Sequence, residues 1–139
     1  MAVATWPLEG ARQNFPLALD EVDHRLVVGC RNPARLLVFD TNSGKVVSSL
    51  TIDSDTDDIF YDAQHKRIYV SCGAGTIDVF EQLDADHYNL VGKTQTASGA
   101  RASLFVPELD RLYLAVPHRR TQKAEIRVYE VLAGLHKHR

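Results

Sequence analysis

The sequence is poor in the features that mark several classes of protein. Its 139 residues include only two cysteines, Cys30 and Cys72, too few for a disulfide-stapled scaffold. No apolar run approaches the roughly 18 to 20 residues that span a bilayer, so we expect no membrane insertion. The opening MAVATWPLEGAR lacks the basic and long apolar regions of a signal peptide, so the chain as written is expected to stay in the cytoplasm.

An excess of one charge is also missing. Lys and Arg number 16 and Asp and Glu number 18, which gives a formal net charge of -2. A general nucleic-acid binder would carry a basic excess, so no nucleic-acid partner is expected. The chain has no GxSxG, HExxH, P-loop or GxGxxG motif, and no window shows a convincing helical stripe. These absences argue against a helical fold and against the enzymes that such motifs mark.

What the sequence does contain is a repeat. Leu26, Ile68 and Leu112 recur at intervals of about 42 to 44 residues, within the short runs RLVVGC, RIYVSC and RLYLAV. A second run follows in each unit, as RLLVFD, TIDVFE and EIRVYE, and turn signals such as NSGK separate the runs. An all-β chain with about four strands per unit of this length predicts the blades of a β-propeller.

We interpret residues 1–139 as one partial propeller with three four-stranded antiparallel blades. The expected units span residues 14–52, 56–96 and 100–132, and residues 133–139 are expected to be a disordered tail. The third unit has only three predicted strands, whereas residues 2–7 resemble a strand without a blade. Because three blades form an open arc, we predict a homodimer that closes a six-bladed ring. In that ring, the first strand of each chain completes the last blade of the other.

The segments NFPLALDEVDHRLVVGCRNPARLLVFDTNSGKVV, DTDDIFYDAQHKRIYVSCGAGTIDVF and LFVPELDRLYLAVPHR resemble the YVTN/YncE-like group of bacterial β-propellers. The resemblance covers nearly the whole chain and implies blades of a ring that usually closes at about seven. Family members are usually longer and often exported, and this chain is similar to their C-terminal part. If the chain is a piece of such a protein, the resemblance implies an exported or periplasmic location.

In a propeller, the loops that enter each innermost strand share one face with the loops between the second and third strands. Here these loops carry both signs of charge, which predicts a pocket for an anionic or zwitterionic ligand or for a protein partner. The candidate residues are Asn14, Arg31, Arg35, Asp57, Asp58, Arg101, His118 and Arg119. The alternative is that neighbouring loops merely pair their charges with one another.

The acidic stretch DSDTDD begins like an EF-hand loop. Asp58 stands where that loop needs glycine, and Gln64 stands where it needs a bidentate glutamate, so an EF-hand is not expected. We therefore expect no cofactor, with a divalent cation such as calcium at Asp55, Asp57 and Asp58 as the alternative.

The favoured function is a non-enzymatic scaffold or binding module, and no catalytic residue is predicted. The rival is a metal-dependent, lactonase-type hydrolase with its site in the central channel. It would need inward carboxylates or amides from different blades, for which Asn14, Asp57 and Asp58 are the candidates. Cys30 and Cys72 occupy equivalent positions of two units, which predicts buried free thiols.

Overall fold

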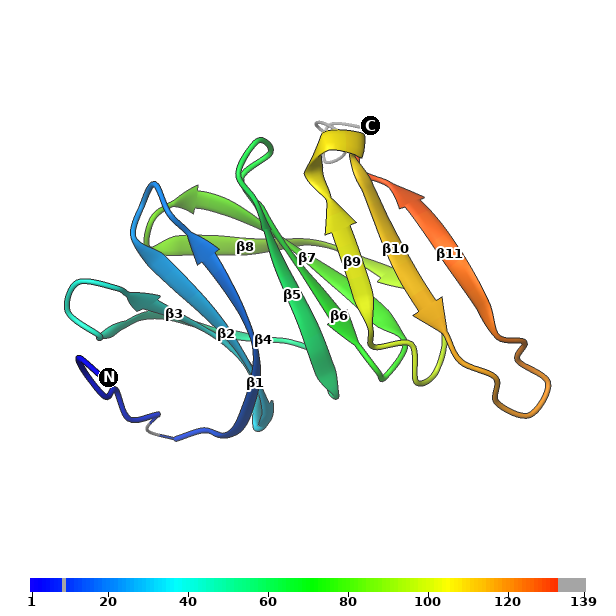
Figure 1. Ribbon diagram of the computed structural model, residues 1–139, viewed down its shortest axis with the longest axis horizontal. Coiled ribbons are helices and arrows are strands. Elements are labelled where there is room, and N and C mark those ends of the chain that lie inside the picture. The colour runs from blue at the N-terminus through cyan, green and yellow to red at the C-terminus, as the bar shows by residue number, and fades with distance from the viewer. Residues whose placement is uncertain (9, 133–139) are drawn as a thin grey trace.

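A computed structural model describes residues 1–8 and 10–132 of the chain (Figure 1). The described residues form eleven strands in three antiparallel sheets, with one short 3-10 turn at Pro107–Leu109. The expected all-β fold class is therefore confirmed. No helix among these residues is long and apolar enough to cross a membrane. The expected tail at residues 133–139 lies outside the described residues.

Each sheet is one blade, and the blades stand side by side in an arc (Figure 1). Blade 1 consists of β1 (Arg12–Asp20), β2 (Arg25–Asn32), β3 (Ala34–Asp40) and β4 (Val46–Thr51), in that order. Blade 2 consists of β5 (Thr56–Asp62), β6 (Arg67–Cys72), β7 (Thr76–Asp84) and β8 (His87–Gln95), in that order. Blade 3 consists of β9 (Ser103–Val106), β10 (Arg111–Val116) and β11 (Glu125–Glu130), and among the described residues it has no fourth strand.

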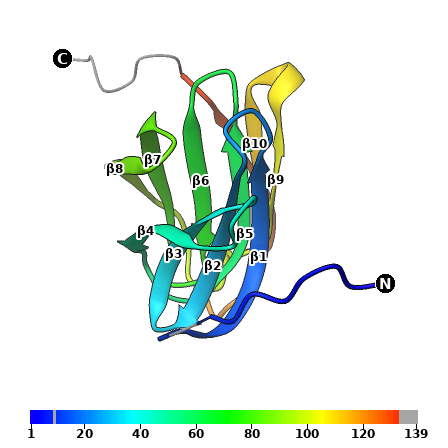
Figure 2. The ribbon, with the colours of Figure 1, turned by 90° about the vertical axis from the view of Figure 1, so that its left-hand side faces the viewer.

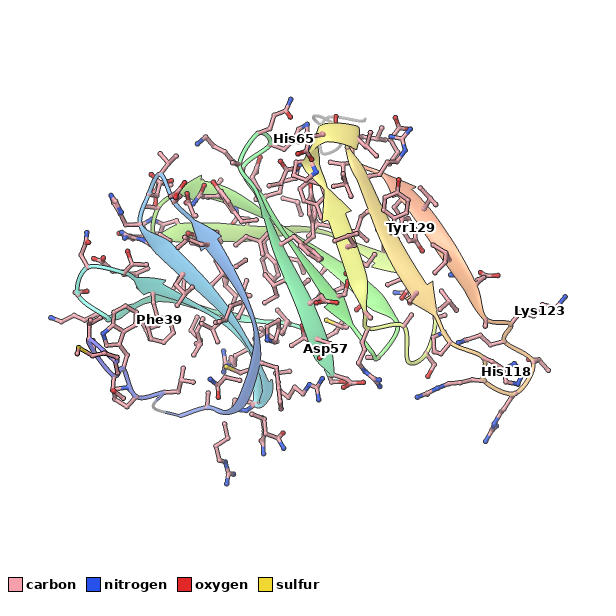
Figure 3. The ribbon with its side chains drawn as sticks, viewed as in Figure 1. Phe39, Asp57, His65, His118, Lys123 and Tyr129 are labelled. Carbon is pink, nitrogen blue, oxygen red and sulfur yellow. The ribbon has the colours of Figure 1, made fainter. Side chains whose placement is uncertain are left out.

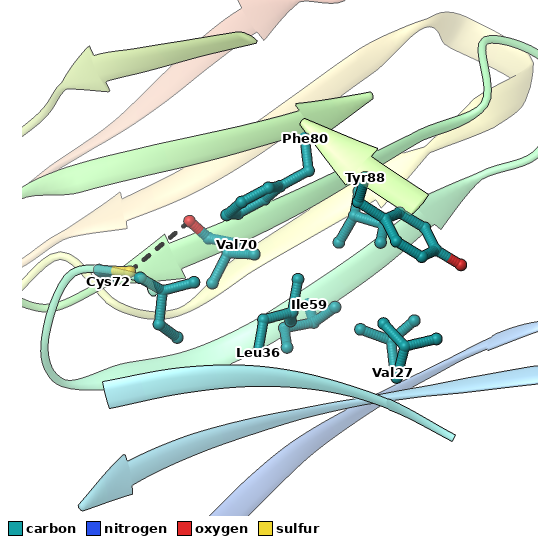
Figure 4. Packing of buried hydrophobic residues seen from close by; sticks show 10 residues of the cluster. Val27, Leu36, Ile59, Val70, Cys72, Phe80 and Tyr88 are labelled. Atoms are coloured by element: carbon teal, nitrogen blue, oxygen red, sulfur yellow. Dashed lines mark hydrogen bonds between the residues drawn. The ribbon is translucent and has the colours of Figure 1, made fainter. Parts of the chain in front are cut away.

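The central blade is buried on both faces, which explains why RIYVSC does not alternate between apolar and polar residues. In β6, Ile68 and Val70 belong to the cluster shared with blade 1 (Figure 4), and Tyr69 belongs to the cluster shared with blade 3. Each large apolar side chain buried in this way contributes about 1.5–3 kcal/mol. The stacking of blades, rather than the sheets alone, therefore stabilises the arc.

The two cysteines lie in this packing as free, buried thiols, as expected. The Cys72 thiol donates a weak hydrogen bond to the Val70 carbonyl at 3.8 Å (Figure 4). Burial raises the pKa of Cys30 and raises that of Cys72 to about 12. Both thiols are therefore packing groups with little thiolate character.

A repeated arginine joins each blade to the next. Arg25 begins β2 and donates to the Ala85 carbonyl at 3.1 Å and to Asp86 at 2.6 Å, both in the β7–β8 turn of blade 2. Arg67 begins β6 and donates to the Leu132 carbonyl of blade 3 at 2.7 Å. This rim of the arc is thus tied from blade to blade by the same residue type at the same position.

The N-terminal segment, residues 1–8, differs from the expectation because the single chain forms no strand at residues 2–7. The segment crosses the face of blade 1 that points away from blade 2, at the end of the arc shown in Figure 2. Trp6 stacks on Phe39 with 6.2 Å between ring centroids, and Leu8 packs beside the same ring. A strand needs a neighbouring edge for its hydrogen bonds, and the free edge of β11 lies at the opposite end of the arc (Figure 1).

Candidate functional site

The predicted loops do gather at one end of the blades. We call this end the loop face; it comprises the loops at residues 32–34, 53–57, 73–75, 97–102 and 117–124. Asp57, His118 and Lys123 mark it along the lower edge of Figure 3, and His65 marks the opposite end of the blades. Side chains from all three blades therefore share the loop face.

Arg31 fixes the blade 1 side of the loop face. Its Nε donates to the Thr56 carbonyl at 2.9 Å, and its Nη2 donates to Asp57 Oδ1 at 3.1 Å. Its guanidinium also lies over the ring of Phe15, 4.4 Å from the centroid. Arg31 is thus held by an ion pair, a carbonyl and an aromatic ring, and its planar fork is ordered before any ligand arrives.

Asp55 continues this chain of charges to blade 3. Its Oδ1 lies 3.7 Å from Arg31 Nη2, and its Oδ2 accepts bonds from Arg101 Nε at 2.9 Å and Arg101 Nη2 at 2.7 Å. A Cβ atom on Gly73 would collide with this carboxylate, so the CGAG turn needs its first glycine. Arg101 therefore pairs with Asp55 rather than with Asp57.

Asp58 has a different environment from its two neighbours. Its Oδ2 accepts the backbone N–H of Ser103 at 2.8 Å, which ties blade 2 to the start of β9. Burial raises the pKa of Asp58; the bond from Ser103 opposes that rise, and the nearby Asp57 charge adds to it. We conclude that Asp58 joins two blades rather than presenting a charge to solvent.

The remaining predicted cations have fewer contacts with carboxylates. Arg119 donates to Ser98 Oγ at 2.9 Å, and within the described chain neither Arg119 nor exposed Arg35 pairs with a carboxylate. His118 is exposed on the same loop. Gln122 orders that loop by donating from Nε2 to the Pro117 carbonyl at 2.7 Å and to the Ser98 carbonyl at 3.1 Å. The loop thus presents its cations from a fixed backbone.

Asn14 does not join this group. Its Cα partner in the sheet is Cys30, and its side chain lines a hollow with Trp6 and Phe39 on the open side of blade 1. The structure therefore does not bring Asn14 together with Asp57 and Asp58 as a channel site would require.

A metal-ligand set is not assembled either. Among the described residues, no three His, Cys, Asp or Glu side chains are grouped so that they could hold a metal ion. Asp55 and Asp57 face arginines, and Asp58 accepts a backbone N–H. At least one oxygen of each of these three carboxylates therefore already accepts a bond from an arginine or a backbone amide.

Sequence reasoning missed a polar cluster on the blade 2 side of the loop face, in which Thr76 and Asp78 are buried and Asp53 and Lys93 are partly exposed. Asp53 accepts bonds from Lys93 Nζ at 2.9 Å and Thr76 Oγ1 at 2.7 Å, and its backbone N–H donates to Asp78 Oδ2 at 2.9 Å. The bond from Lys93 is the main cause that lowers the pKa of Asp53, whereas burial raises the pKa of Asp78. The cluster is structural, because its bonds join the loop that contains Asp53 to β7 and β8 of blade 2.

One signal in the sequence could have revealed this cluster. Asp78 pairs with Val70 in the sheet, and Leu37 pairs with Val28 at the same position of blade 1. A carboxylate thus stands in TIDVF where blade 1 has Leu37 and blade 3 has Arg127. Such a substitution at a buried position indicates a local polar partner.

Comparison with known proteins shows similarity of fold to solved structures. No protein-family model and no curated protein matches the chain. The hydrazine synthase of Kuenenia stuttgartiensis is similar over 83% of this chain and 32% of its own, with a TM-score of 0.66 and 10% identity. A Bacteroides uniformis protein, whose suggested identity is a 6-phosphogluconolactonase, is similar over 95% of this chain and 42% of its own, with a TM-score of 0.69 and 16% identity.

Both neighbours have β-propeller-type folds, and identities this low show the fold alone. The chain therefore has the fold of propeller blades. It spans less than half the length of either neighbour.

Proposed function

We propose that the chain is a non-enzymatic binding module of the YVTN/YncE-like kind, and that its loop face binds an anionic ligand. One observation carries the proposal: charged side chains from three blades meet on that face, and its cations exceed the carboxylates available to them. Arg31 and Arg101 share Asp55 and Asp57, while Arg35 and Arg119 have no carboxylate partner among the described residues.

This arrangement suits recognition better than chemistry. Paired arginines are held in place by their carboxylates, so they shape the surface, and the less engaged cations supply charge for a ligand. Because these groups are partly exposed, binding should weaken as salt screens them. A lactonase-type hydrolase draws support only from the suggested identity of one neighbour, and the residues it would use do not converge.

The proposal is tested with inorganic pyrophosphate as the anionic probe and isothermal titration at 50 mM salt. The variant Arg35→Glu/Arg119→Glu reverses two exposed charges on the loop face and should weaken binding about tenfold or more, since each charge-assisted bond is worth about 1.5–3 kcal/mol. Lys66→Glu makes the same kind of charge reversal on the opposite rim and should leave the affinity unchanged. Absence of saturable binding, or equal losses in the two variants, would reject the loop face as an anion site.

A further inference from the structure

Two blade faces of the single chain are open. Blade 3 presents Leu104, Ile126 and Val128 to solvent on the side away from blade 2, and blade 1 presents Leu17 and Leu19 on its own far side. Contiguous apolar side chains of this size on a sheet face mark an association surface. Comparison of equivalent positions in the three blades indicates which surface would pack against each open face.

The strand registers indicate that the open face of blade 3 is the face on which a following blade would pack. The pairs at one position of the three blades are Val27–Val38, Tyr69–Val79 and Tyr113–Val128. The first two pairs are buried against the next blade, with Val79 only 9% exposed, whereas Val128 is 55% exposed. Blade 3 therefore shows to water the side chains that the other blades bury against a following blade.

The arginine series gives an independent indication. Arg111 begins β10, as Arg25 begins β2 and Arg67 begins β6. The other two donate to the following blade, whereas Arg111 donates to the Leu109 carbonyl at 3.1 Å and lies 3.7 Å from Glu130, both within blade 3. A following blade would supply Arg111 with an acceptor outside blade 3, and the β3–β4 turn of blade 1, residues 41–45, offers carbonyls of that kind.

The open face of blade 1 has the complementary form. Phe39 occupies the position of Phe80 in blade 2, because each pairs with the matched aliphatic of its repeat. Val47 and Leu50 of β4 pack against the cluster that contains Phe80, and Trp6 stacks on Phe39. The N-terminal segment thus lies on blade 1 where the fourth strand of a preceding blade would lie.

Blade 3 has room for that strand. A hollow of about 240 Å³ lies between blades 2 and 3, and its lining includes Tyr69 and Val79 of blade 2 and Tyr129 and Val131 of blade 3. Between blades 1 and 2, the cluster at this level is completed by buried Tyr88 from the fourth strand β8. The hollow therefore corresponds to a fourth-strand side chain, which blade 3 lacks among the described residues.

We propose that a second copy of this chain covers both open faces. Blade 3 of each copy packs on blade 1 of the other, and the N-terminal segment of each adds to β11 of the other as its fourth strand. Along an extended segment, Val3 and Thr5 alternate with Trp6, so they face the hollow while Trp6 stays on Phe39. Each contact joins two different faces, blade 3 of one copy and blade 1 of the other. A two-fold axis forms both contacts at once, so that two three-bladed arcs close a six-bladed ring.

The first test is the mass of the full chain by light scattering at about 50 μM. The expected result is a single species at twice 15.5 kDa. A soluble monomer would overturn the proposal and leave the faces to blades of another chain, and an open-ended or larger assembly would overturn the two-copy ring. Ile126→Asp places a charge in the proposed contact and should yield a monomer with an unchanged circular dichroism spectrum. Val22→Asp introduces the same charge at another exposed apolar residue, in the β1–β2 turn, and should stay dimeric.

A second variant tests the arginine contact without touching the apolar faces. Arg111→Ala should raise the dissociation constant of the dimer about tenfold or more, because it removes a charge-assisted bond to the other copy. Arg120→Ala removes an exposed arginine of the loop face and should leave that constant unchanged. Equal constants for these two variants would show that Arg111 makes no bond across the contact and would refute that part of the proposal.

Discussion

Replacing Asp78 by asparagine should stabilise the protein at high pH. Asp78 is 0% exposed, its Oδ2 accepts the Asp53 N–H at 2.9 Å, and its Oδ1 has no hydrogen-bond partner within the described chain. Burial raises the pKa of Asp78, the Asp53 N–H opposes that rise, and the Asp53 charge adds to it, with Lys93 opposing. The fold therefore prefers the neutral form of this side chain.

The sign and size of the effect follow from these contacts. A carboxyl group whose folded pKa lies above the unfolded value of about 3.9 stabilises the fold below that value and loses this stabilisation as pH rises through the folded pKa. Asparagine keeps an oxygen for the Asp53 N–H but cannot ionise. Because each unit by which a folded pKa is raised corresponds to about 1.4 kcal/mol, Asp78→Asn should gain about 1 kcal/mol or more over the wild type at pH 8 and little at pH 4.

The assay is urea unfolding of both proteins at pH 4, 6 and 8 and one fixed protein concentration, since association would add to apparent stability. Asp84→Asn is the matched control. Asp84 lies at the surface with its pKa lowered, chiefly by the Asp86 N–H and then by His87, so its replacement should lower stability more at pH 8 than at pH 4. If Asp78→Asn were no more stable relative to wild type at pH 8 than at pH 4, the reasoning about this carboxylate would be refuted.

Three further outcomes are expected. A thiol reagent at pH 8 should label neither Cys30 nor Cys72 in the folded protein and both in urea without reductant; absence of labelling in urea until reductant is added would mean a disulfide. Ile68→Ala should lower the free energy of unfolding by about 2–5 kcal/mol in urea melts, because Ile68 is 0% exposed between blades; a loss below about 1 kcal/mol would contradict this packing. Calcium titration should show no saturable binding, and binding that Asp57→Ala and Asp58→Ala each abolish would favour the hydrolase instead.

The strands could be predicted because the repeat constrains them three times over. RLVVGC, RIYVSC and RLYLAV all became central strands, β2, β6 and β10, and each begins with the arginine of the rim. The N-terminal segment could not be placed in the same way. Its residues fit a strand, but a strand depends on a hydrogen-bonding edge, and composition does not say which edge is within reach.

The position of the loop face could be predicted from the sequence, but the contacts between its residues could not. Topology puts the loops at one end, which is why Arg31, Asp57, Arg101 and His118 share it. Which aspartate meets which arginine depends on a register shift between Thr56 and Asp58 in β5. Such a shift changes the face on which each following side chain points, and the sequence does not show where it falls.

The most direct test of the binding function is the location of the anion site itself. Amide chemical shifts of the labelled chain should be followed as inorganic pyrophosphate is added. Saturable changes are expected at residues 31–35, 55–58, 99–101 and 118–123, which lie on the loop face or directly beside it. Changes confined to residues 41–45 and 84–87, in the turns at the opposite end of the blades, would contradict this expectation.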